Sequence, residues 1–141
     1  MKHIVADTSI VVKWVLPDRD DEGHADKALR ILELIRESRV AVHQPPHWLA
    51  ETSAVIQRLS PETAMADIED LCAINFDVIE APEVYLKACE LSSELKHHIF
   101  DTLYHAVALL MQDTVLVTAD RKYFGKAESY GNIALLESAG F

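Results

Sequence analysis

The stretch IVADTS, residues 4–9, decides how this chain of 141 residues is expected to fold. Its first three residues are apolar and two of them are β-branched, which is typical of a short buried strand. The strand ends abruptly at a carboxylate, Asp7. Further short apolar runs predict four more strands, at residues 40–42, 76–79, 115–117 and 133–136.

Segments with apolar residues at helical spacing lie between the predicted strands. They cover residues 10–16, 25–35, 48–59, 82–95 and 99–111. A further helix is expected to begin at Pro61, with Ser60 as its N-cap. The segment 99–111 is apolar on nearly every side and should be the most buried helix. Strands that alternate with helices predict an α/β domain, with a mostly parallel sheet covered by helices on both faces.

Composition indicates one domain over residues 1–141, with 50% hydrophobic residues to build its core. The net charge of −10 excludes the basic footprint that many nucleic-acid-binding domains carry over the whole chain. Two cysteines are too few for a disulfide scaffold or a four-cysteine zinc site. We expect a soluble, cytoplasmic protein, because no apolar run reaches a membrane span and Asp7 interrupts any signal peptide. The acidic segment 18–22 follows Pro17 and is expected to be a solvated loop.

Four carboxylates stand out by their positions. Asp7 and Asp120 follow predicted strands, and parallel strands bring their carboxyl ends to one edge of a sheet, where open α/β sheets bind ligands. Glu51 and Asp101 lie in helices where the local pattern favours apolar residues. Each acid alone has an ordinary explanation, since Asp101, for example, suits a helix N-terminus. Together they predict a shared acidic pocket.

Converging carboxylates repel one another, and mutual repulsion should raise the pKa of at least one of them. A divalent cation would relieve this repulsion, and a set of oxygen ligands favours Mg²⁺ or Mn²⁺ over zinc. Such an ion bridges to phosphate oxygens and activates water, which points to hydrolysis of phosphodiester bonds. The affinity for the ion should fall as pH drops, because the ligands must be ionised.

Four short motifs in order resemble those of PIN-domain ribonucleases. They are the Asp7-Thr8-Ser9 opening, the segment 46–51 with a proline before a helix that carries Glu51, the segment 100–106 around Asp101, and Thr118-Ala119-Asp120 followed by Phe124. They span nearly the whole chain. The size and single-domain form look most like the VapC-type toxins of toxin–antitoxin pairs.

The resemblance implies a three-layer fold around a five-stranded sheet of order 3-2-1-4-5. It also implies endonucleolytic cleavage of RNA that depends on Mg²⁺ (or Mn²⁺), with Asp7, Glu51, Asp101 and Asp120 as the metal-binding and catalytic acids. The implied partners are the RNA substrate and a cognate antitoxin that covers the carboxylates with a basic segment. A homodimer, or a hetero-oligomer with the antitoxin, is expected as well. Two departures from the family's usual residues, Phe100 and Thr102, affect no expected ligand.

Several neighbours are weaker candidates. The hydroxyls of Thr8, Ser9 and Thr118 could orient a metal-bound water, although Ser9 equally suits the N-cap of the helix 10–16. His105 follows Asp101 by four residues, so it shares that helix face as a supporting residue or as an ordinary buried histidine. His97 and His98 are expected to point apart, and no histidine spacing resembles a zinc site. Four basic residues could contact RNA phosphates or lie in solvated loops: Lys13, Arg121, Lys122 and Lys126.

Two other functions remain open at this point. A catalytically silent scaffold of the same fold would act through protein–protein contacts. A phosphoacceptor receiver domain also gathers acids at strand ends, but it expects paired acids after the first strand and a Lys after a late one. Here Asp7 stands alone and Thr118 is followed by Asp120.

Overall fold

The structure is a computed structural model that describes residues 1–19 and 23–141. Most of the acidic segment 18–22 therefore lies outside the described residues. The strands are β1 (Lys2–Ala6), β2 (Val40–Gln44), β3 (Asp77–Val78), β4 (Thr114–Thr118) and β5 (Ile133–Leu135). The α-helices are α1 (Thr8–Val15), α2 (Ala25–Arg36), α3 (Trp48–Leu59), α4 (Ala64–Ala73), α5 (Pro82–Leu95), α6 (Ile99–Leu110) and α7 (Arg121–Ala127). Short 3-10 turns occupy Pro17–Arg19, Glu128–Tyr130 and Leu136–Ser138.

The five strands form one sheet in the order β3-β2-β1-β4-β5, and each neighbouring pair is parallel. Ile4 in the central strand stands opposite Val42 on one side and Val115 on the other. The apolar runs therefore pair with one another in the middle of the sheet, as the sequence predicts. The strand order that the resemblance implied is confirmed.

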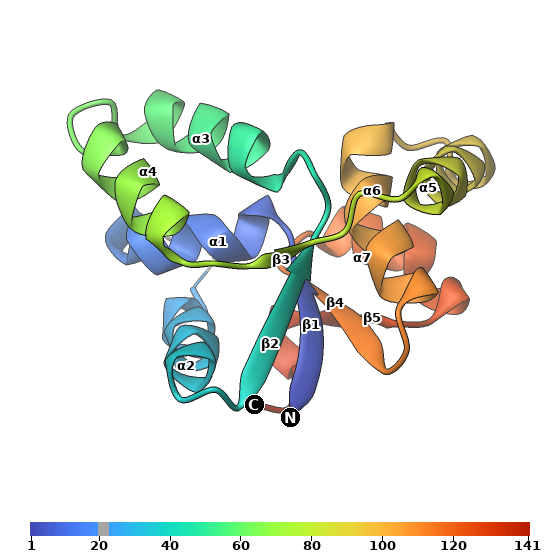
Figure 1. Ribbon diagram of the computed structural model, residues 1–141, viewed down its shortest axis with the longest axis horizontal. Helices are drawn as coiled ribbons and strands as arrows, with labels where there is room; N and C mark the ends of the chain where they lie inside the picture. Colours follow the sequence, from blue (N-terminus) through green and yellow to red (C-terminus); the bar gives the residue numbers. More distant parts are fainter. Residues whose placement is uncertain (20–22) are drawn as a thin grey trace.

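Helices cover both faces of the sheet (Figure 1), which makes the three layers expected. Helices α1 to α4 lie on one side and α5 to α7 on the other. This division follows from right-handed crossovers, because the chain first steps outward from β1 to β3 and later steps the opposite way from β4 to β5. The direction changes between β1 and β4. Such a switch point leaves an open crevice at the carboxyl ends of its two strands.

Helix α6 is the most deeply buried helix, as predicted. Its residues from Thr102 to Ala108 are all buried, and the helix packs on α5 and on strands β1 and β4. On the other face Trp14 and Trp48 are buried and both pack against Phe76. The helix that carries Asp101 is thus fixed by the core rather than by surface contacts.

Two local predictions were wrong, and one helix was not foreseen. Residues 61–63 form a turn and α4 begins only at Ala64, because the Ser60 hydroxyl bonds the side chains of Glu62 and Thr63 instead of capping a helix. Helix α1 begins at Thr8, so Asp7 and not Ser9 occupies its N-cap position. Residues 121–127, for which no element was expected, form helix α7, which the Asp120 side chain caps.

Among the described residues, no helix combines the length and apolarity that crossing a membrane requires.

Candidate metal centre

Asp7 lies at the carboxyl end of β1, on one side of the switch point. Its carboxylate accepts hydrogen bonds from the hydroxyls of Ser9 and Thr118. Thr118 ends the neighbouring strand β4, and the Ser9 hydroxyl also accepts a bond from the Ala119 backbone N–H at 2.9 Å. The strand ends of β1 and β4 are therefore joined through the Asp7 side chain and the hydroxyls around it.

The protein raises the pKa of Asp7 to about 7. Burial is the largest cause, because it penalises the charged carboxylate, and the nearby charges of Asp101 and Asp120 raise the pKa further. The hydrogen bonds from Ser9 and Thr118 act in the opposite direction and only partly offset these effects. One of the grouped acids thus has a raised pKa, but burial, and not the mutual repulsion on which the expectation rested, is the main cause.

Asp120 lies across the switch point, just beyond β4. One oxygen of its side chain accepts a bond from the Tyr123 backbone N–H at 3.0 Å, which caps α7. Its own backbone N–H donates to the Thr118 hydroxyl at 3.0 Å. Thr118 was a candidate partner of Asp120, and the structure shows that its hydroxyl joins the carboxylate of Asp7 to the backbone of Asp120.

Glu51 lies in the first turn of α3, and its side chain accepts hydrogen bonds from two hydroxyls. Thr8 donates to its Oε1 at 2.7 Å and Tyr104 donates to the same oxygen at 3.1 Å. Burial, and then the charge of Glu51, raises the pKa of Tyr104, and Asp7 contributes in the same direction. Tyr104 therefore stays protonated and available as a donor, with both acids in electrostatic range.

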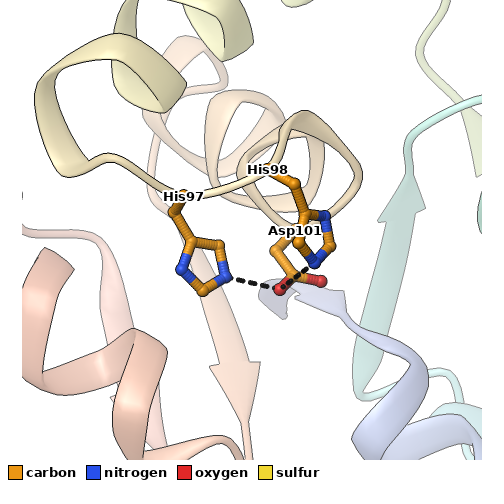
Figure 2. A group of neighbouring side chains, drawn as sticks. All are labelled: His97, His98 and Asp101. Carbon is orange, nitrogen blue, oxygen red and sulfur yellow. Dashed lines mark hydrogen bonds and ion pairs between the residues drawn. The ribbon is translucent and has the colours of Figure 1, made fainter.

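Asp101 lies in the first turn of α6, and two imidazoles lie against its carboxylate (Figure 2). His97 Nε2 lies 2.6 Å from Asp101 Oδ2, and His98 Nε2 lies 3.3 Å from the same oxygen. The expectation that these two histidines point apart was wrong. Their rings stack with centroids 5.1 Å apart, because the chain turns sharply at the left-handed residue Lys96 just before α6.

The four acids do not form a closed cage. Among the described residues, His97, His98 and Asp101 are the group whose ligand atoms all lie within 4.8 Å of one another. Asp101 and Asp120 act on Asp7 electrostatically, and Glu51 and Asp7 both raise the pKa of Tyr104. Carboxylates that lie apart in this way suit a hydrated divalent cation, because Mg²⁺ keeps several waters between itself and its protein ligands.

The basic candidates divide into two groups. Lys13, Arg121 and Lys122 line a cavity of about 510 Å³ beside Asp120. Arg121 also forms a 2.7 Å ion pair with Glu137 in this cavity. Lys126 lies elsewhere, with its ammonium group 3.2 Å from His97 Nδ1.

His105 is a buried structural histidine. Its Nδ1 lies 3.0 Å from the Tyr123 hydroxyl and its Nε2 lies 2.8 Å from the Gly131 carbonyl oxygen. Burial lowers its pKa, so the ring is neutral. The two ring nitrogens are used by these partners, and His105 does not reach the acids directly.

Two residues at the site had no role in the sequence analysis. Tyr104 lies one helical turn beyond Asp101, and this spacing could have indicated it. Gln44 is fully buried at the end of β2, and its side-chain amide bonds both the N–H and the carbonyl oxygen of Ala6, at 3.2 and 2.8 Å. A glutamine at the end of an apolar strand stands out in the sequence, but the hydrophobic pattern alone does not show which groups its amide would bond.

Comparisons with known proteins agree with this architecture. The structure is similar to the crystal structure of PAE2754 from Pyrobaculum aerophilum, with a TM-score of 0.67 and 17% identity, over 97% of this chain and 91% of that one. It is also similar to VapBC2 from Rickettsia felis, solved bound to a DNA fragment from its promoter, with a TM-score of 0.65 and 18% identity, over 94% of this chain and 96% of that one. A comparison with curated proteins finds no match.

The sequence profile of the PIN domain matches residues 4–129. This range includes four of the five strands, apart from the first two residues of β1, and it contains the four acids. Strand β5 lies beyond it. The chain therefore belongs to the PIN domain family.

Proposed function

We propose that this protein is a metal-dependent endoribonuclease that acts as the toxin of a toxin–antitoxin pair. PIN domains are generally nucleases, which supports the reaction class. The observation that carries the proposal is the Asp7 carboxylate, half-buried at the switch point in electrostatic range of Asp101 and Asp120, with its pKa raised to about 7. A protein that keeps a carboxylate there sacrifices stability, and a bound cation would restore it.

The chain's own residues would prepare the site in distinct ways. Asp7, Asp101, Asp120 and Glu51 would hold the ion. Bound Mg²⁺ or Mn²⁺ would lower the pKa of a water and stabilise the charge that develops on the phosphate oxygens. Ser9 and Thr118 orient Asp7, while Thr8 and Tyr104 orient Glu51.

The cavity beside Asp120 supports an RNA-binding role. Three cationic side chains, from Lys13, Arg121 and Lys122, line it within reach of the acidic edge. Cations next to a carboxylate centre suit a polyanion whose scissile phosphate lies over the acids and whose next phosphates lie in the cavity. Binding there would offset the repulsion between RNA and a chain of net charge −10.

The partner in the proposed pair is an antitoxin with a basic segment. The structural neighbour VapBC2 is described as bound to a DNA fragment from its promoter, and the likeness supports the same kind of partnership here. A basic segment over the acids would supply the charge that the ion otherwise supplies. We further propose a homodimer in the absence of the antitoxin, and a hetero-oligomer in its presence.

The test is cleavage of structured RNA by the purified protein with Mg²⁺ or Mn²⁺, with and without EDTA. The Asp7→Asn and Asp101→Asn variants should lose at least about 100-fold in rate, because each removes a ligand of the proposed ion. Asp70→Asn, an exposed acid of α4, is the matched control and should cleave like the wild type.

Cleavage that persists in EDTA, or in both site variants, would contradict the proposal. Absence of cleavage together with tight binding of a protein partner would instead favour the silent scaffold.

A further inference from the structure

His97, His98 and Asp101 bring three metal-ligating atoms together at the turn between α5 and α6 (Figure 2). Both imidazole Nε2 atoms face one carboxylate oxygen, at 2.6 and 3.3 Å. All three ligand atoms lie within 4.8 Å of one another. The turn that creates this arrangement includes the left-handed backbone of Lys96, which places the two histidines at the start of α6.

The donor set differs in chemistry from the acids around Asp7. Two imidazole nitrogens and one carboxylate oxygen suit borderline ions such as Zn²⁺ and Co²⁺, whereas oxygen ligands alone suit Mg²⁺. A tetrahedral ion with bonds of about 2.0–2.1 Å spaces its ligands about 3.3 Å apart. The distance from His98 Nε2 to Asp101 Oδ2 already has this value. The distance from His97 Nε2 to the same oxygen needs to increase by less than about 1 Å.

The surroundings leave room for an ion and its remaining ligand. The side chain of His98 is 66% exposed and that of Asp101 is 31% exposed. The His97 side chain is only 10% exposed, and the Tyr123 ring packs edge-on against it. One histidine is thus a fixed ligand, and the open side of the group allows water to complete the coordination.

The hydrogen bonds of His97 show which hydrogen a bound ion would replace. The Lys126 ammonium group lies 3.2 Å from His97 Nδ1, and an ammonium can only donate, so this nitrogen accepts. The ring is then neutral and its Nε2–H donates to Asp101. An ion that takes the place of this hydrogen requires the proton to move to Nδ1, and Lys126, which is exposed, is free to swing toward the Lys96 carbonyl oxygen at 3.5 Å.

We propose that His97, His98 and Asp101 form a second metal position, which binds Zn²⁺ or a similar borderline ion and is distinct from the centre at Asp7. Asp101 belongs to both. An ion at the histidines therefore withdraws this carboxylate from the Asp7 centre, and Zn²⁺ should inhibit RNA cleavage. The inhibition rests on the proposed nuclease function, whereas the metal position itself does not.

The experiment is calorimetric titration of the full chain with Zn²⁺ in the presence of excess Mg²⁺, with Co²⁺ absorption as a second readout. The wild type and Asp7→Asn should bind one Zn²⁺ each with similar affinity, and bound Co²⁺ should show the visible bands of nitrogen and oxygen coordination. Loss of a supporting partner already costs about 10–100-fold in metal affinity. The double variant His97→Ala with His98→Ala should therefore lose at least about 100-fold.

His24→Asn is the matched control, because asparagine tolerates the left-handed backbone found there. If the double variant does not fold, the exposed His98→Ala substitution alone must weaken Zn²⁺ binding by at least about tenfold. Zn²⁺ binding that survives the histidine substitutions, or that is lost in Asp7→Asn, overturns the proposal. A protein that binds Zn²⁺ as described but cleaves no RNA retains the second metal position and loses the nuclease function.

Discussion

Asp7 and Asp101 lie in electrostatic range of each other, yet the protein compensates their charges in different ways. Asp7 has only hydroxyl donors among its described partners, and burial raises its pKa to about 7, so a proton neutralises it in mildly acidic solution. Asp101 is half-buried and has two imidazoles against it. The charge of Asp7 is thus neutralised by an exchangeable proton or ion, whereas the charge of Asp101 is compensated by two neighbouring imidazoles.

The largest expected effect is the stabilisation of the folded protein by bound metal, which should depend on Asp7. Mn²⁺ at about 100 times its dissociation constant should stabilise the wild type by about 2.7 kcal/mol. Asp7→Asn should gain less than about 0.5 kcal/mol at the same Mn²⁺ concentration, because the lost ligand raises the dissociation constant. Thermal unfolding at pH 8 measures this difference, with Asp70→Asn as control. Equal gains in wild type and Asp7→Asn would place the ion elsewhere.

The next largest effect is a fall in Mn²⁺ affinity as pH decreases. The ion must displace the Asp7 proton below pH about 7, so affinity should fall by about tenfold per pH unit there and level off above it. Calorimetry from pH 8 to 5.5 measures the slope. A flat profile would mean that Asp7 binds no ion.

The stability of the metal-free protein should also depend on the titration of Asp7, but it should fall as pH rises, whereas the Mn²⁺ affinity rises. The unfolded carboxyl titrates near 3.8 and the native one near 7, so between these values only the native state holds the proton. Stability therefore falls as pH rises through this window and is constant above it. Asp7→Asn should remove this fall and be more stable than the wild type at pH 8 by about 1–2 kcal/mol.

Asp101→Asn sharpens the test, because the charge of Asp101 is a smaller cause of the Asp7 shift than burial is. This variant should keep most of the slope between about pH 4 and 7. Chemical denaturation in EDTA at a series of pH values follows both variants. The comparison fails if Asp101→Asn flattens the profile as much as Asp7→Asn does.

The smallest expected effect isolates one hydroxyl. Thr118→Val and Thr114→Val each remove a buried hydroxyl from β4, so both should destabilise the protein by about 1–2 kcal/mol. Of these two hydroxyls, that of Thr118 lowers the pKa of Asp7. Its loss should therefore move the midpoint of Mn²⁺ binding to higher pH, and Thr114→Val should not. Parallel shifts in the two variants would refute a specific role for Thr118.

Much of the fold and the approximate place of the acids could be predicted from the sequence. Apolar runs that end in acids identify strand ends, and parallel pairing must bring those ends to one edge, which is why Asp7 and Asp120 could be placed together. Segments 48–59 and 82–95 even have the predicted bounds. These inferences depend on periodicity, which the core enforces over many residues.

The failures concern choices that single side chains make. The Asp120 carboxylate could remain free or cap a helix, and only the surrounding fold decides that it caps α7. Adjacent histidines point apart in a regular helix, but His97 lies in the turn before α6, where a left-handed residue redirects the chain. Likewise, Tyr104 and Gln44 find their partners 53 and 38 residues away, which no local pattern reports.

The buried amide of Gln44 has one more consequence. By bonding both polar groups of the Ala6 backbone, it attaches the last residue of β1 to β2 just where the carboxylate begins. On the other side, Ala6 faces Val117 in β4. The main chain that carries Asp7 is thus anchored in two directions, so thermal motion at this point requires three strands to move together, and the carboxylate keeps its position whether or not it holds a proton.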